Sequence, residues 1–219
     1  TDAVMDSPAC VAIDEAETLR ILDAFTGRPV GEPQSLRARN WSLAFSPDGR
    51  WFAAPLSNGV QLLDAATGRP AMHLAGTNPM NRVVFSPDGT RVAASGRHRW
   101  IEIWDVSSGR RPCPPLASAE IPAMMEFSPD GRRIASASQR SLSSWDVATG
   151  KPIWQPFQPG GDLFGCRFSP DGQWLATASW DGFARVYDAR TSLPIGDSMR
   201  HRGGVGVGSS TLMVGTSGP

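Results

Sequence analysis

Short apolar runs recur along the chain and are separated by turns rich in glycine, proline and aspartate. In one stretch the runs are RVVFS (82–86), RVAASG (91–96), WIEIWDV (100–106) and RRPCPPL (110–116). Their β-branched and aromatic residues, with Pro-Asp-Gly or Ser-Ser-Gly between them, predict strands joined by tight turns. No run has the 3.6-residue period of an amphipathic helix, so the pattern predicts an all-β chain. The fourth run is rich in proline, which cannot donate to a β-ladder, and we expect it to form an outer edge strand.

The pattern repeats along the chain. The motif FSPDG stands at 45–49, 85–89, 127–131 and 168–172, at spacings of 40, 42 and 41 residues. A second marker ends in an aspartate after the third run of each unit, with spacings of 41, 41, 41 and 42 residues. Two markers that share one period indicate a repeat architecture. The repeated aspartates are Asp48, Asp88, Asp130 and Asp171 in the first marker, and Asp23, Asp64, Asp105, Asp146 and Asp188 in the second.

A repeating four-stranded sheet has two apolar faces, which radial stacking buries in a β-propeller. The residues before the second aspartates include Trp104, Trp145 and Tyr187, and these pairs follow FSPDG hairpins. In these features residues 3–205 resemble the WD-repeat β-propeller family, and the repeat tails are similar to those of large bacterial WD-repeat arrays. The resemblance implies a WD-repeat β-propeller fold.

The period predicts four complete four-stranded blades, at 41–80, 81–122, 123–163 and 164–202. Partial blades are predicted at 1–40 and 203–219. Propellers of the family usually have more blades, so we expect a fragment of a larger protein that holds the remaining blades of a longer array. The alternative is a five-bladed ring, in which a strand at 204–208 completes the N-terminal blade.

Residues 203–219 break the pattern. They read GGVGVGSSTLMVGTSGP, although the period predicts another FSPDG at 210–214. Read one base earlier, the codons there can encode Phe-x-Pro-Asp-Gly, so one interpretation is a blade lost to a frameshift near Val205. The alternative is a flexible Gly/Ser-rich terminus. Under either interpretation we expect poor order.

The resemblance also implies a buried hydrogen-bonded set of His, Ser or Thr, Asp and Trp in each blade. The set is incomplete in this chain. Ser179 and Asp181 have no upstream histidine, and arginines stand in or beside the turns that follow Ser95 and Ser138. We therefore expect apolar packing and backbone ladders to contribute more than polar networks.

Composition excludes several classes of function. The chain has 21 basic and 21 acidic residues, which gives no reason to expect nucleic acid or an anionic membrane as partner. It has neither a signal peptide nor an apolar run of membrane-spanning length, although a targeting segment could precede Thr1. Cys10, Cys113 and Cys166 lie far apart without CxxC spacing, which fits a reducing, cytoplasmic compartment.

We expect no catalytic residue, no cofactor and no metal. GVGVG at 204–208 lacks the Lys-Ser/Thr of a phosphate loop. His73, His98 and His201 lie in three different units without ligand spacing. The repeated aspartates fit turns better than calcium binding or catalysis, because aspartate bonds its own backbone there. Cys166 alternates with apolar residues and fits a core position.

The loops between the second and third strands form the predicted working surface. The resemblance implies that this end of the blades, with the loops before the first strands, docks other proteins. Trp and Arg are the residue types that dominate binding hot spots. The candidates are Trp180, Arg97, His98, Arg99 and Arg140 in these loops, with Arg37, Arg39 and Arg82 nearby. Trp180 is predicted to anchor an acidic or aromatic peptide; the alternative is that it covers the rim of a neighbouring blade.

These features predict a non-catalytic scaffold for protein–protein interaction, within a larger signalling or regulatory protein, and an unidentified protein or peptide as its partner. An enzymatic propeller, such as a hydrolase or lactonase, is one alternative. It would need a cluster of carboxylates or histidines lining the central channel, and the sequence offers no such cluster at matching repeat positions. Nucleic-acid binding through the arginine face is another, and overall neutrality speaks against it.

Overall fold

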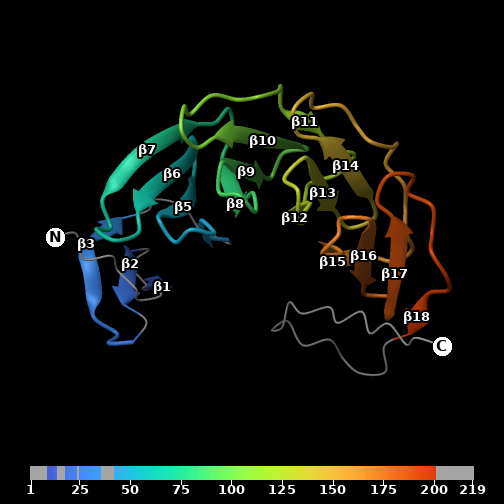
Figure 1. Ribbon diagram of the computed structural model, residues 1–219, viewed down its shortest axis with the longest axis horizontal. Coiled ribbons are helices and arrows are strands. Elements are labelled where there is room, and N and C mark those ends of the chain that lie inside the picture. Colours follow the sequence, from blue (N-terminus) through green and yellow to red (C-terminus); the bar gives the residue numbers. More distant parts are fainter. Residues whose placement is uncertain (1–8, 14–17, 24, 36–41, 201–219) are drawn as a thin grey trace.

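The chain forms an arc of antiparallel β-sheets (Figure 1). The computed structural model describes residues 9–13, 18–23, 25–35 and 42–200, which contain strands and turns but no helix. Sheets 1 to 5, numbered in chain order, follow one another around the arc, with β8, β12 and β15 on its inner side. The prediction of an all-β chain is confirmed.

Each sheet is a meander in which neighbouring strands pair antiparallel. Sheet 1 contains β1 (Ala9–Ile13), β2 (Thr18–Asp23) and β3 (Pro29–Ser35). Sheet 2 contains β4 (Ala44–Phe45), β5 (Trp51–Leu56), β6 (Gly59–Asp64) and β7 (Pro70–Ala75). Sheet 3 contains β8 (Met80–Phe85), β9 (Arg91–Gly96), β10 (Trp100–Asp105) and β11 (Leu116–Ala117). Sheet 4 contains β12 (Met124–Phe127), β13 (Arg133–Ala137) and β14 (Leu142–Asp146). Sheet 5 contains β15 (Leu163–Phe168), β16 (Trp174–Ser179), β17 (Phe183–Asp188) and β18 (Met199–Arg200).

The FSPDG motif recurs because it closes the hairpin between the first two strands of a unit. In sheet 2 the Ser46 hydroxyl donates to Asp48 Oδ1 at 2.5 Å and accepts the Trp51 N–H at 2.8 Å. Gly49 adopts a φ of +69°, which glycine tolerates without a steric penalty. The same serine–aspartate bond forms in sheets 3, 4 and 5. The Ser46 hydrogen bond holds the pKa of Asp48 below its usual value.

The second repeated aspartate closes the turn after the third strand. The Asp64 carboxylate accepts both the N–H and the hydroxyl of Thr67, at 2.8 and 2.7 Å. The Gly68 N–H then donates to the Asp64 carbonyl at 2.8 Å, and Gly68 has a φ of +69°. In sheet 5 this position is Ser192, which has a φ of +61° and is the one described non-glycine residue with a positive φ.

Replacing Ser192 with glycine is therefore expected to stabilise the protein by about 1 kcal/mol, because a side chain in the left-handed region is strained. Chemical denaturation followed by circular dichroism would measure the change. Gly27→Ser is the matched reverse exchange, since Gly27 has a φ of +66° with open space around its missing Cβ. It should destabilise by a similar amount. A Ser192→Gly variant with unchanged or lower stability would contradict the assignment of strain.

The sheets are held together by hydrophobic seams. In the part of the chain that is described, four buried clusters lie between successive sheets. Trp104, Trp145 and Tyr187 each face the preceding sheet, at the same position of the repeat. Arginine side chains also cross the seams: Arg133 of sheet 4 donates to the Gly172 and Ala189 carbonyls of sheet 5. The repeat period thus places one core layer between each pair of sheets.

The prediction for the outer strand of each unit, its fourth segment, is wrong in part. The run 110–116 was predicted as a strand, but the strand there is β11, Leu116–Ala117, because Pro112, Pro114 and Pro115 cannot donate to β10. In sheet 4 the outer segment makes isolated bridges, Leu142 with Phe157 and Trp145 with Pro152. The predicted four complete four-stranded blades are therefore three four-stranded sheets and one three-stranded sheet.

Several predictions fall outside the described residues. They concern Arg37, Arg39 and His201, and the interpretation of 203–219 as a frameshifted or flexible segment. The five-bladed alternative, which needs a strand at 204–208, lies outside them as well. The domain boundaries stay predictions, although each predicted unit from 41 to 202 holds the greater part of one sheet.

Candidate functional site

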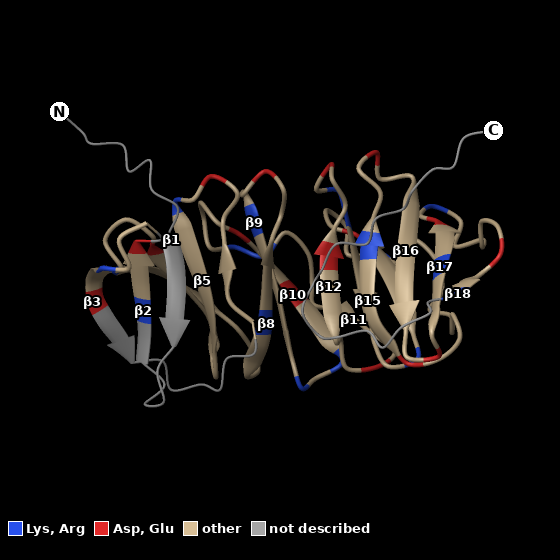
Figure 2. Cartoon of the chain, turned by 90° about the horizontal axis from the view of Figure 1, so that it is seen from below, with Lys and Arg blue, Asp and Glu red and all other residues tan. Residues whose placement is uncertain are grey.

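The two ends of the sheets carry different residues. The FSPDG hairpins and the Asp-x-x-Thr-Gly turns lie at one end, which we call the turn face. The loops between the second and third strands, and those that enter the first strands, lie at the opposite end, which we call the loop face. Figure 2, in which acidic residues are red and basic residues blue, shows red on turn tips along the upper edge and blue on a loop below β8 and β10. The predicted docking residues that the structure describes belong to the loop face.

A surface hollow of about 500 Å³ opens on the loop face between sheets 3 and 4. Sheet 3 supplies one wall, through Arg82 at the start of β8 and through Arg97 and Arg99 in the loop between β9 and β10. The opposite wall comes from the segment that enters β12 and from the loop after β13. The residues of these walls are Asn81, Arg82, Arg97, Arg99, Glu120, Ile121, Pro122, Ala123 and Gln139.

The three arginines of the hollow, Arg82, Arg97 and Arg99, form no ion pair among the described residues. The Arg82 guanidinium is half-buried and contacts the Met124 sulfur at 3.9 Å, which is a weak acceptor. Burial lowers the pKa of Arg82 from its ordinary value. Arg97 and Arg99 are exposed. The hollow thus concentrates positive charge, and one of its charges is partly removed from water.

Glu120 is the acidic residue of the hollow, and its carboxylate has a partner. Glu120 Oε2 accepts the backbone N–H of Arg140 at 2.8 Å. The Arg140 side chain points toward sheet 5, where its Nε lies 3.5 Å from Asp162 Oδ1. Both members of this pair are well exposed, so the pair contributes little stability. Arg140 therefore connects the hollow to sheet 5 without lining it.

The wall opposite the arginines was missed by the sequence analysis. Ile121 is 50% exposed, Pro122 is buried, and Gln139 projects from the next loop. A signal was present, because Ile121 is an apolar residue between Glu120 and Pro122 in a loop where packing does not require one. Its position beside Arg82 depends on how two sheets stack, which a pattern of single residues does not reveal.

Trp180 lies on the loop face of sheet 5, in the turn between β16 and β17. Its indole is 62% exposed and meets Phe164 of the same sheet, with ring centroids 5.1 Å apart. The Trp180 backbone N–H donates to the Asp162 carbonyl at 2.8 Å. The alternative that Trp180 covers the rim of a neighbouring blade is not supported by this contact, because Phe164 belongs to sheet 5. Its role as an anchor stays a prediction.

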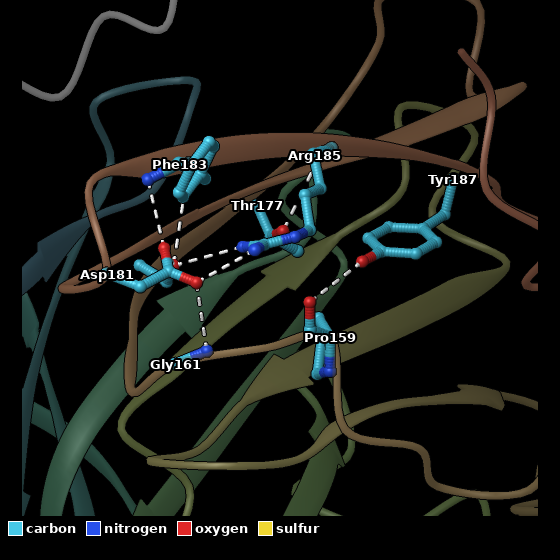
Figure 3. Close-up of polar contacts among 8 residues, drawn as sticks. Pro159, Gly161, Thr177, Asp181, Phe183, Arg185 and Tyr187 are labelled. Carbon is cyan, nitrogen blue, oxygen red and sulfur yellow. Dashed lines mark hydrogen bonds and ion pairs between the residues drawn. The ribbon is translucent and has the colours of Figure 1, made fainter. Parts of the chain in front are cut away.

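A polar network holds the turn that presents Trp180 (Figure 3). The Asp181 carboxylate accepts the Phe183 N–H at 2.9 Å, the Gly161 N–H at 3.1 Å and an Arg185 guanidinium N–H at 2.8 Å. The Ser179 hydroxyl also donates to it. The Arg185 hydrogen bond keeps the pKa of Asp181 far below its usual value. Arg185 thus supplies a cationic partner where the family pattern has a histidine.

Sheet 3 has a second substitute network, at its seam with sheet 2. Glu102 is fully buried on β10, and its Oε1 accepts the N–H and the hydroxyl of Thr77 at 3.1 and 2.5 Å. Arg111 Nη2 lies 2.5 Å from Glu102 Oε2 and donates to the Ala75 carbonyl at 2.8 Å. Sheets 3 and 5 therefore contain polar networks in place of the incomplete family set, while the expectation that apolar packing and backbone ladders contribute more stays a prediction. The buried hydroxyls of Ser95 and Ser138 have no hydrogen-bond partner among the described residues.

The other titratable groups of the described residues lie outside the hollow. Within the described ranges no three His, Cys, Asp or Glu residues gather as metal ligands would. Burial raises the pKa of Glu126 to about 7, against the lowering effect of Arg167 3.3 Å away. Burial also raises the pKa of Cys166 to about 12, which makes its thiol unreactive. His98 is half-buried and does not line the hollow. The described part of the chain holds no helix that could cross a bilayer.

Comparison with known proteins agrees with the repeat architecture. The family described as WD domain, G-beta repeat matches residues 68–105 and 152–188. These ranges run from the end of one repeat to the Trp-Asp or Tyr-Asp marker of the next. No curated protein sequence matches the chain. The matched repeats, the Trp104-Asp105 and Tyr187-Asp188 markers and the stacked antiparallel sheets agree: the chain contains WD repeats, and its sheets are β-propeller blades.

Proposed function

We propose that the protein is a non-catalytic scaffold that docks another protein or peptide on its loop face. WD repeats generally mediate protein–protein interactions and are typically non-enzymatic. One observation carries the proposal for this chain: the loop face holds the hollow with Arg82, Arg97 and Arg99. A cytoplasmic setting is part of the proposal, because Cys113 and Cys166 are buried free thiols, which suits a reducing compartment.

The hollow and Trp180 belong to one continuous part of the loop face. Gln139 lines the hollow, and its carbonyl accepts the Leu163 N–H of sheet 5 at 2.7 Å. Arg140, the next residue, lies beside Asp162, whose carbonyl accepts the Trp180 N–H. An extended peptide could therefore fill the hollow and reach the exposed indole. Aromatic and arginine anchors of this kind contribute most of the affinity in protein interfaces.

A peptide fits this face better than a nucleic acid does. Nucleic-acid surfaces present basic residues along a track that follows the phosphates. In this chain three arginines, which form no ion pair among the described residues, converge on one hollow between two sheets, beside the apolar Ile121. The formal net charge of the whole chain is zero. This arrangement supports recognition of a short acidic segment with an apolar neighbour.

A peptide library displayed on phage tests the proposal. Peptides selected on the wild-type chain are expected to lose affinity by about tenfold or more with Trp180→Ala, and with Arg97→Glu combined with Arg99→Glu. Arg110→Glu is the matched control, since Arg110 is an exposed arginine on the turn face of the same sheet as Arg97. Fluorescence anisotropy would give the dissociation constants. Peptides that bind all variants equally would show that the loop face is not the docking surface.

A further inference from the structure

We propose that the hollow between sheets 3 and 4 binds a phosphorylated serine or threonine side chain of the docked peptide. The inference rests on the proposed docking function and adds the chemical class of the partner. It concerns one hollow, lined by Arg82, Arg97 and Arg99 on one side and by Ile121 and Gln139 on the other.

The charge of the hollow matches a dianion. Three arginines against one glutamate leave a net charge of +2. A phosphate monoester carries a charge of about −2 at neutral pH and offers three acceptor oxygens. Glu120 Oε2 accepts the Arg140 N–H, and among the described residues Glu120 forms no ion pair with the three guanidinium groups. A single carboxylate would neutralise half of this charge.

The arginines are held in place by one sheet. Arg82 lies on β8, where it pairs with Ser95 of β9 next to an irregularity in the strand register. Arg97 and Arg99 stand in the short loop that continues from β9 into β10. The backbones of all three therefore belong to sheet 3, on one side of the hollow. Guanidinium groups bind phosphate through parallel N–H donors, and this bonding is stronger when a group is partly desolvated, as Arg82 is.

The opposite wall suits the residue next to the phosphorylated one. Ile121 is half-exposed, and with Pro122 and Ala123 it forms an apolar strip across from the arginines. The Gln139 side chain can donate to and accept from a peptide backbone. A volume of about 500 Å³ accommodates a side chain with part of its neighbour. The hollow thus favours a phosphorylated residue within a peptide over a free inorganic ion.

The test uses labelled degenerate peptides in three forms, with phosphothreonine, threonine or glutamate fixed at the centre. Fluorescence anisotropy on the whole chain should show at least about tenfold tighter binding of the phosphothreonine form. Arg97→Gln combined with Arg99→Gln should remove this preference, and so should Arg82→Gln. Arg110→Gln, on the turn face, should keep it. If Arg82→Gln fails to fold, the exposed Arg97/Arg99 pair still decides the result, and circular dichroism checks the fold of each variant.

Three outcomes would overturn the inference. Equal binding of the phosphothreonine and threonine forms would show that the hollow does not recognise phosphate. Docking on the loop face would still stand if Trp180→Ala weakened the binding of both forms. A phosphate preference that survives in the Arg97/Arg99 variant would place the phosphate elsewhere. Inorganic phosphate that competes as well as the phosphopeptide would show a general anion site with no peptide recognition.

Discussion

Trp104→Ala is expected to lower the free energy of unfolding by about 3–5 kcal/mol, since it removes a buried aromatic side chain and leaves a cavity. Trp104 is 1% exposed and packs in the cluster between sheets 2 and 3 with Leu62, Leu74 and Val83. Its indole N–H also donates to the Ala75 carbonyl of sheet 2 at 3.3 Å. The substitution therefore weakens the seam from both its apolar and its polar side.

Urea denaturation followed by circular dichroism would measure the loss. Trp180→Ala is the matched control: it removes the same side chain from an exposed turn and should change stability by about 0.5 kcal/mol or less. In a repeat protein, a weakened seam also separates the transitions of its two sides. Equal effects of the two tryptophan substitutions would show that the seam between sheets 2 and 3 does not hold the fold.

Arg111→Met is expected to destabilise the protein by about 3–5 kcal/mol, because it leaves the buried Glu102 carboxylate without its cationic partner. The Glu102 side chain is fully buried, whereas that of Arg111 is 28% exposed. Arg111 also covers the Trp104 ring, with the guanidinium carbon 5.5 Å from its centroid. Thr77 alone would then have to satisfy the charged carboxylate.

The double variant Arg111→Met with Glu102→Gln separates charge from packing. It should recover much of the lost stability, because a neutral amide is less costly to bury than an unpaired carboxylate. Arg110→Met changes the exposed arginine immediately before Arg111 and should have little effect on the free energy of unfolding. The measurement is the same urea titration, combined as a double-mutant cycle. A double variant as unstable as Arg111→Met would assign the loss to packing on Trp104.

The turns could be predicted from the sequence because their contacts are local. In FSPDG the serine, aspartate and glycine meet within five residues, and the same bonds form in four sheets. The second strand of each unit, which follows the FSPDG turn, could also be predicted, because its pattern of residues is local. The outer strands could be predicted less well: proline was recognised as an edge residue, but three prolines between 112 and 115 reduced the strand to Leu116–Ala117.

The candidate site could be predicted in part. Arg82, Arg97 and Arg99 were among the predicted residues, and the structure gathers them around one hollow. Arg140 was predicted with them, but its side chain lies beside Asp162. Ile121 and Gln139 were not predicted, since their position beside the arginines of sheet 3 depends on how sheets 3 and 4 stack. The choice among these residues depends on side-chain direction at a seam, which the period of the motif does not encode.

By itself the sequence determined the all-β class, the repeat of about 41 residues and the turns that separate the strands, because each depends on short-range bonds and on alternation along a strand. The tertiary structure decided which residues replace the missing polar set. Glu102 meets Thr77 and Arg111, and Asp181 meets Arg185 and Gly161, only once the strands have paired and the sheets have stacked. It also decided that the loop-face arginines share one hollow with the next sheet. Apart from Asp181 and Arg185, which lie four residues apart, these contacts join residues far apart in the chain, and the buried Glu102 carboxylate in particular needs a partner.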